Sequence, residues 1–155
     1  SSKYEQHQLF AHWVNANLDR FDFINEGERL CGEWLAQAHG TRYALTHEPF
    51  VPFDLMRGAE RAPFEEFRRR VEPSNFTLPH LLSIGPPVSI ARAMEMLCDN
   101  GFHGAIDPAE GAVWRVERRG VVDFLGKYVR PDKRDGCYLP EIGGQESIWN
   151  WRPGK

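Results

Sequence analysis

The sequence of 155 residues predicts an α+β domain with mostly antiparallel sheet. Segments with strand and helix periodicity are mixed along the chain, without the regular strand–helix–strand alternation that a parallel sheet requires. The clearest strands, 111–117 and 121–129, flank the short turn 118–120 and therefore predict an antiparallel hairpin. Because a chain of this length can bury a core of its own, we expect residues 1–155 to form a single domain.

The first half of the chain is predicted to open with a helix and to continue as strands. Apolar residues recur at helical spacing across 5–18, with polar residues between them. Pro49 and Pro52 place the strand that contains them at a sheet edge or demand an irregularity there. Strands are expected at 30–35, 43–46 and 50–56, and a short helix at 62–71.

The second half begins with a predicted buried strand at 78–83. Ser89 is placed to cap a helix over 90–98, which Asn100-Gly101 then ends. The hairpin follows, and the tail from residue 131 is rich in proline and glycine and is expected to be mostly loop. Its Trp149-Asn150-Trp151 segment is interpreted as an anchor that fixes the tail to the core, with base stacking as the alternative.

Composition excludes some functions and favours a location. A net charge of −3 gives no overall basic field for nucleic acid, although the arginine clusters near 68–70, 118–119 and 130–134 could contact phosphates locally. The cluster at 68–70 is interpreted as a solvated face. Three widely spaced cysteines make no paired metal-ligand motif and fit a reducing compartment, so a cytoplasmic location is expected. No apolar run approaches the length of a membrane span, so we expect no membrane partner.

Two charged residues of the hairpin suggest chemistry. Glu110 lies at the start of one strand and Lys127 lies inside the next, so pairing through the 118–120 turn would project both into one groove. A carboxylate for a divalent metal and an ammonium for a phosphate are what phosphoryl or nucleotidyl transfer needs. The alternative is a structural one, since charged residues often flank hairpins.

Two upstream segments give this pair a context. Residues 30–35 read LCGEWL and residues 50–56 read FVPFDLM, and both precede the EGAV run that starts at Glu110. In this order, together with the strand around Lys127, they resemble the later motifs of the covalent nucleotidyltransferases. That superfamily comprises the RNA and DNA ligases and the capping enzymes. The sequences of these motifs are most similar to those of the RNA ligase family, and the resemblance covers residues 25–135.

The resemblance implies roles for three polar residues. Glu33 would contact the ribose of the nucleotide, whose hydroxyls can donate to a carboxylate. Glu110 would bind Mg²⁺ or Mn²⁺, and Lys127 would neutralise the α-phosphate during transfer. Both Glu110 and Lys127 are therefore expected to be catalytic, with ATP, or the AMP derived from it, as cofactor.

Three further residues have roles that the resemblance leaves less direct. Phe50 is expected to stack on the purine, and Phe53 would then lie in the core, because the two rings should point to opposite faces of a strand. Arg130 is expected to bind the nucleotide as a second cation, where the family carries a second lysine. Asp54 either helps to position the metal or the lysine, or has a structural role.

The nucleophile of the resembled family is a lysine in a Lys-x-Asp-Gly motif upstream of these segments. Residues 133–136 spell this motif but follow the last strand in a polar turn, so we interpret them as an accidental match. The resemblance therefore implies an adenylation domain that lacks its N-terminal motif, with this chain as the larger C-terminal part.

The function that follows is that of an ATP-dependent RNA ligase. Such an enzyme joins the 5′-phosphate and 3′-hydroxyl ends of nicked or broken RNA through enzyme–AMP and RNA–adenylate intermediates. We expect this chain alone to be inactive. The alternatives are a nucleotide- or RNA-binding module with a degenerate pocket, and a structural interaction domain in which the motifs are coincidental.

Overall fold

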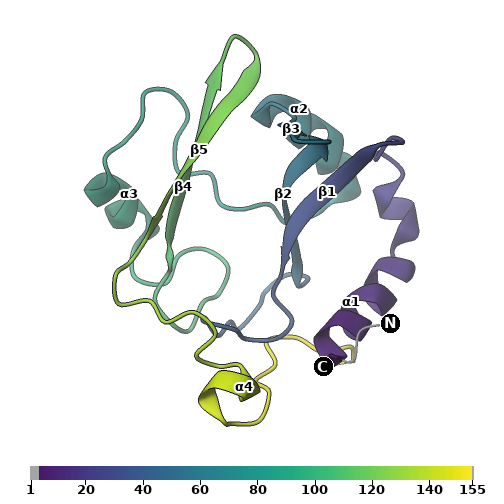
Figure 1. Cartoon of the computed structure of the whole chain (residues 1–155), viewed down its shortest axis with the longest axis vertical. Coiled ribbons are helices and arrows are strands. Elements are labelled where there is room, and N and C mark those ends of the chain that lie inside the picture. The colour runs from purple at the N-terminus through teal and green to yellow at the C-terminus, as the bar shows by residue number, and fades with distance from the viewer. Residues whose placement is uncertain (1–3, 155) are drawn as a thin grey trace.

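A computed structural model describes residues 4–154 and confirms the α+β class (Figure 1). The described residues form two antiparallel sheets, one with strand order β1-β2-β3 and one made of β4 and β5. The helices are α1 (Glu5–Asn15), α2 (Phe64–Val71), α3 (Ile90–Leu97) and α4 (Pro140–Gly143), and the strands are β1 (Glu28–Trp34), β2 (Phe50–Arg57), β3 (Glu60–Arg61), β4 (Gly111–Arg118) and β5 (Val121–Val129). Among these residues, no helix is long and apolar enough to cross a membrane.

The first sheet contains the irregularity that the prolines of β2 predict. Gly32 pairs with Pro52 and Cys31 pairs with Asp54, so Phe53 is an extra residue without a partner on β1. This is a β-bulge, which bends the strand and interrupts the alternation of its side chains. On the other side of β2, the short β3 pairs only with the last two residues of β2. Pro52 therefore lies on a locally free edge, where its missing N–H is tolerated.

The core lies between α1 and the outer face of this sheet. Trp13 of α1 and Phe50 of β2 are 9% and 5% exposed, and their ring centroids are 5.7 Å apart. Leu55, Phe67 and Val71 are also buried in the cluster, so α2 belongs to it as well. Further aromatic rings complete the cluster around Phe50, namely Phe10, Phe21, Trp34 and Phe76.

The second sheet is the predicted hairpin. Arg119 and Gly120 have φ values of 53° and 77°, which is the left-handed geometry of a tight two-residue turn that matches the twist of its strands. The predicted cap of α3 is present, since the Ser89 hydroxyl accepts a hydrogen bond from the backbone N–H of Arg92. The indole of Trp114 donates to the carbonyl of Val88 and thereby joins β4 to the start of α3.

Two predicted strands are not formed. Tyr43 makes only an isolated bridge with Ala105, and residues 78–83 run as an extended loop. Leu81 and Ile84 in and beside that loop are 45% and 70% exposed. Both predictions were wrong because strand propensity produces a strand only where a neighbouring sheet edge offers a partner.

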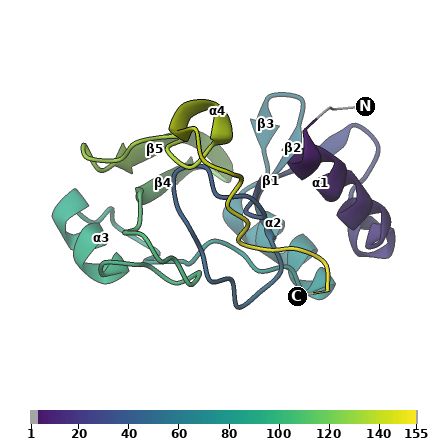
Figure 2. The ribbon, with the colours of Figure 1, turned by 90° about the horizontal axis from the view of Figure 1, so that it is seen from below.

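The tail forms the predicted anchor. Asn150 accepts a hydrogen bond from the backbone N–H of Tyr43 and donates to the carbonyl of Leu35, and Trp151 contacts Trp34 at 6.1 Å between ring centroids. Figure 2 shows this C-terminal segment running beside the segment that follows β1. The anchor thus fixes the loop between β1 and β2, which carries several residues of the site described next.

Candidate functional site

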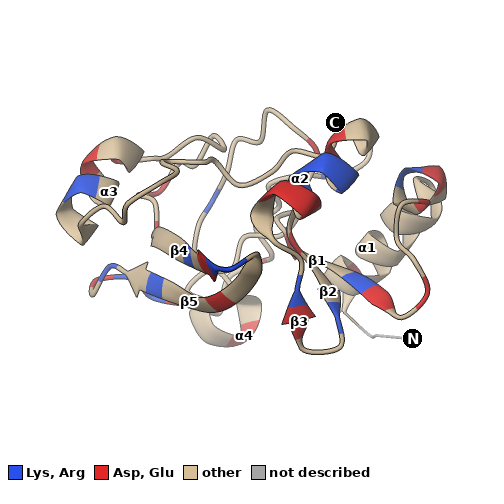
Figure 3. Cartoon of the chain, turned by 90° about the horizontal axis from the view of Figure 1, so that it is seen from above, with Lys and Arg blue, Asp and Glu red and all other residues tan. Residues whose placement is uncertain are grey.

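One face of the β4–β5 hairpin is directed toward the first sheet (Figures 1 and 3). Val113 and Lys127 are direct cross-strand partners, and Arg115 lies two residues further along β4 on the same face. The guanidinium of Arg115 donates to the Asp54 carboxylate and to the Phe53 carbonyl of β2. Lys127 therefore lies on the wall of the hairpin that faces the first sheet.

The opposite wall contributes Glu33. Its neighbour Trp34 contacts the core, so Glu33 points to the other face of β1, toward the hairpin. Partial desolvation raises the pKa of the Glu33 carboxyl, although this residue is exposed, and the negative charge of Glu110 raises it further. His39 and Lys127 oppose this shift. Glu110 and Lys127 are thus each within electrostatic range of Glu33, and we call the region around these three residues the inter-sheet site.

Glu110 precedes β4 at the base of the hairpin. Its carbonyl accepts a hydrogen bond from the backbone N–H of Arg130, which extends the ladder of the two strands by one step. Its carboxylate is 42% exposed, and Oε1 receives the Lys133 ammonium at 2.6 Å and the Thr41 hydroxyl at 3.3 Å. Tyr43 lies close enough to these carboxylates to be affected by them. Burial raises the pKa of its phenol, and the charges of Glu110 and Glu33 raise it further.

The sequence prediction did not include Thr41, Tyr43 or Lys133 in the site. Thr41 and Tyr43 belong to the loop between β1 and β2, and nothing in their spacing relates them to the hairpin. Lys133 could have been found from the sequence, because it begins a Lys-x-Asp-Gly motif, but we interpreted that motif as an accidental match. The structure places its ammonium at Glu110, so this lysine does lie in the inter-sheet site.

The expected pocket position of Phe50 is corrected by the structure. Its ring belongs to the aromatic core and is 5% exposed, whereas Phe53 is 39% exposed. The same packing explains Gly32, since a Cβ at that position would lie 2.5 Å from Cε2 of Phe50. Gly32 therefore makes room for a core ring.

The structure also decides the expectations for Arg130 and Asp54. The Arg130 guanidinium has its nearest carboxylate at Asp132, 3.7 Å away, so the second cation at Glu110 is Lys133. Asp54 is 2% exposed and forms ion pairs with Arg61, at 2.9 Å, and with Arg115. One carboxylate oxygen binds Arg61 within the first sheet and the other binds Arg115 of β4, which is the structural role that the sequence left open.

The donor set can support a metal ion only in part. Within residues 4–154, no group of three or more histidine, cysteine, aspartate or glutamate side chains is arranged to hold a metal. Glu110 and Glu33 offer hard oxygen donors on the two walls of the site. Such a set fits Mg²⁺ or Mn²⁺ that takes its remaining ligands from phosphates and water, as these ions commonly do.

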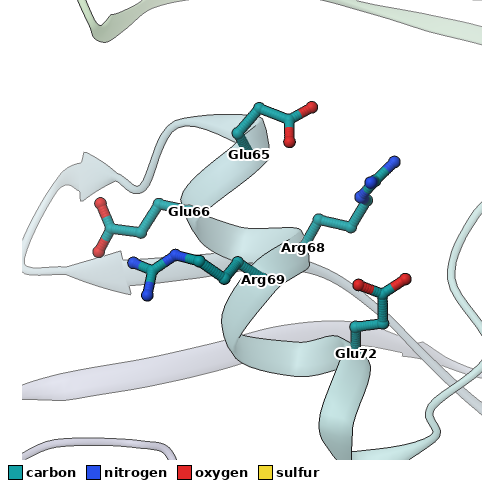
Figure 4. Close-up of a pocket in the computed structure, with 5 residues that line it drawn as sticks. All are labelled: Glu65, Glu66, Arg68, Arg69 and Glu72. Carbon is teal, nitrogen blue, oxygen red and sulfur yellow. The ribbon is translucent and has the colours of Figure 1, made fainter.

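A shallow hollow on the surface of α2 contributes nothing to this site. It is lined by charged residues of both signs, Glu65, Glu66, Arg68, Arg69 and Glu72 (Figure 4). Glu66 and Arg69 extend to one side of the helix and the other three to the opposite side. Arg70, by contrast, is tied to Glu28 at 2.6 Å. In the arginine cluster 68–70, Arg68 and Arg69 therefore belong to a surface of mixed charge, and Arg70 forms a structural ion pair.

Comparison with known proteins gave one result. Residues 1–129 match the family model described as RNA ligase, so the match spans most of the chain and includes Glu33, Glu110 and Lys127. No curated protein and no solved structure matches the chain significantly.

Proposed function

This chain belongs to the RNA ligase family, and we propose that it is part of the adenylation domain of an ATP-dependent RNA ligase. The proposed reaction joins an RNA 5′-phosphate to a 3′-hydroxyl through enzyme–AMP and RNA–adenylate intermediates. The observation that supports the proposal is that the charges of Glu110 and Lys127, at the start of β4 and on β5, both act on Glu33 of β1.

In this proposal each wall binds a different part of the nucleotide. Glu33 accepts hydrogen bonds from the ribose hydroxyls, and the Lys127 ammonium neutralises a phosphate oxygen. Phe53, the exposed aromatic residue of β2, takes the base-stacking role for which Phe50 is too deeply buried. A bound Mg²⁺ or Mn²⁺ would supply positive charge that offsets the phosphates during transfer, and Glu110 is the residue that would hold it.

We expect that this chain alone does not form a stable covalent bond to AMP. The only Lys-x-Asp-Gly run in the sequence is 133–136. The Lys133 ammonium already donates to three acceptors, namely the Gly40 carbonyl, the Thr41 hydroxyl and the Glu110 carboxylate, so its nitrogen is engaged in structural contacts. Incubation with ATP labelled in the α-phosphate, followed by denaturing gel electrophoresis, should show no labelled protein.

The last chemical step can be tested without an AMP-carrying lysine. The substrate is an RNA strand already adenylated on its 5′-phosphate, held beside a 3′-hydroxyl strand by a complementary RNA. The 3′-oxygen attacks the 5′-phosphorus, its proton goes to solvent, and AMP leaves, so no ATP is consumed. The chain alone is expected to be inactive in the complete ATP-dependent reaction, which needs the AMP-carrying lysine, but with Mg²⁺ present we expect it to catalyse this last step. Binding of ATP without any sealing would favour the binding-module alternative, and loss of both would reject the site.

Lys127→Ala should reduce the single-turnover sealing rate strongly with little change in the thermal melt. Loss of one charge-assisted phosphate contact costs about 2 to 4 kcal/mol of transition-state stabilisation. This corresponds to a rate loss of roughly thirty- to a thousand-fold. Arg130→Ala should cost less, because its guanidinium lies toward Asp132. Arg118→Ala, at the exposed end of the same hairpin, is the matched control. Near-normal sealing by folded Lys127→Ala would remove the role of Lys127.

A further inference from the structure

Lys133 is a lysine of the inter-sheet site whose ammonium is held by two hydrogen bonds and an ion pair. Its side chain is only 7% exposed, and its ammonium lies 2.5 Å from the carbonyl oxygen of Gly40, 2.6 Å from the Thr41 hydroxyl and 2.6 Å from Glu110 Oε1. An ammonium has three protons to donate, and these three acceptors account for all of them. The lysine therefore connects the loop after β1 to the carboxylate at the base of β4.

The loop after β1 is shaped to receive this side chain. A Cβ at Gly40 would lie 2.8 Å from both Cε and Nζ of Lys133, so only glycine leaves room for the stem and the ammonium. On the other side, the turn after β5 brings the lysine back, with the backbone N–H of Lys133 donating to the Arg130 carbonyl. Two chain segments thus place one ammonium beside Glu110.

The arrangement fixes the orientation of the Glu110 carboxylate. Lys133 and Thr41 both bind Oε1, so these contacts leave Oε2 for another cation. Glu110 is otherwise 42% exposed and would be free to change rotamer. A carboxylate that must hold a metal benefits from outer contacts that fix its geometry.

From these contacts we infer that Lys133 is a positioning residue, which holds Glu110 and the Gly40–Thr41 loop in the geometry that binds a divalent cation together with nucleotide phosphates. This inference rests on the proposed function, since it takes Glu110 as the residue that holds the metal. It assigns Lys133 a purpose apart from covalent chemistry: its positive charge acts on Glu110, and the substrate does not contact it.

The test measures metal binding directly. Mn²⁺ is titrated into the intact chain in the presence of ATP, and free Mn²⁺ is followed by electron paramagnetic resonance. Lys133→Met keeps an unbranched stem but removes the charge, and Gly40→Ala displaces the ammonium without changing any charge. Arg134→Met, which removes a positive charge from the exposed neighbour, is the control. We expect the first two variants to weaken Mn²⁺ binding by about 10- to 100-fold, as is typical for loss of an outer contact to a ligand. The control should bind as the unmodified chain does.

The outcomes separate this inference from the proposed function. Unchanged Mn²⁺ affinity in folded Lys133→Met or Gly40→Ala overturns the inference while the proposed function stands. Tighter binding overturns it too, because the ammonium would then be a competitor of the metal. Covalent AMP labelling of the unmodified chain that Lys133→Met abolishes would make Lys133 the nucleophile instead. Absence of both Mn²⁺–ATP binding and sealing in the unmodified chain rejects the proposed function and the inference together. If Lys133→Met does not fold, as judged by its thermal melt, Gly40→Ala decides.

Discussion

The two sheets of the molecule are stabilised in different ways. The β1–β2–β3 sheet rests on a cluster of aromatic rings, with Phe50 and Leu55 only 5% and 2% exposed. The β4–β5 hairpin leaves Val113, Val121 and Phe124 more than half exposed. The first sheet is therefore held by buried apolar area, while the hairpin depends on its own ladder and on a few contacts to neighbouring segments.

The contacts that join the two halves are mostly polar. Arg115 binds Asp54, Lys133 binds Glu110, and Arg42 binds Asp107 at 2.7 Å. The two sheets therefore differ in what holds them, since buried apolar area stabilises the first sheet and polar contacts join the hairpin to it.

The largest expected effect tests the stability of the first sheet. Phe50→Ala should reduce the free energy of unfolding by about 3 to 5 kcal/mol, because it opens a cavity among buried rings. Phe124→Ala on the hairpin should cost about 0.5 kcal/mol or less, since its ring is 52% exposed. Urea unfolding of both variants, followed by tryptophan fluorescence, measures the two values. Similar losses at both positions would show that the sheets contribute equally.

The junction itself is tested by Arg115→Met. The substitution removes one of the two arginines that bind the buried Asp54, and charged hydrogen bonds contribute about 1.5 to 3 kcal/mol each. Amide hydrogen exchange should accelerate in β4 and β5 more than in β1 and β2, as expected for local opening. Arg118→Met, whose side chain is 70% exposed, serves as the control and should change neither. Uniform acceleration across both sheets would contradict a separable hairpin.

A pair of histidines gives the junction a pH dependence. Nδ1 of His103 lies 3.0 Å from Nε2 of His47, and burial, followed by the positive charges of His47 and His80, lowers the pKa of His103 below its ordinary value of 6.5. The unfolded chain then takes up a proton that the folded chain resists, so stability should fall as the pH drops below about 6.5.

We expect stability to fall between pH 7.5 and 5.5 by no more than about 1.4 kcal/mol, the limit for a folded state in which His103 takes up no proton. His103→Asn should flatten this part of the profile, and His12→Asn, at an exposed position of α1, should leave it unchanged. Thermal melts across the pH range provide the measurement. A steeper profile in His103→Asn would mean that His103 is protonated in the folded protein.

The smallest expected change in stability concerns Glu33. Its pKa is raised, so the folded protein disfavours the charged form, and stability is lost as the pH rises from 4.5 through the folded pKa. Glu33→Gln should therefore equal or exceed the unmodified chain in stability at pH 7, by about 0.5 kcal/mol or less because water reaches this side chain. ATP binding, measured by calorimetry, should weaken in the same variant. A clear loss of stability would show that Glu33 is structural.

Much of the fold followed from local signals. The hairpin was predicted from two apolar segments around a turn, and Arg119 and Gly120 adopt the backbone that such a turn needs. The Ser89 cap and the irregular β2 strand were predicted on equally local grounds. Segments 43–46 and 78–83 show the limit of such signals, because their strand propensity found no sheet edge to pair with.

The sequence alone determined the α+β class, the hairpin and the family motifs that contain Glu33, Glu110 and Lys127. Turn geometry, helix capping and motif spacing depend only on residues that are neighbours along the chain. Tertiary structure decided which phenylalanine of β2 is buried. The two rings differ in burial, as the strand alternation predicts, but the aromatic cluster receives Phe50, which the family resemblance had assigned to the pocket. Tertiary structure also decided that Lys133 accompanies Glu110, because a buried ammonium must find acceptors wherever the fold supplies them, and here they come from Gly40 and Thr41, more than ninety residues earlier in the chain.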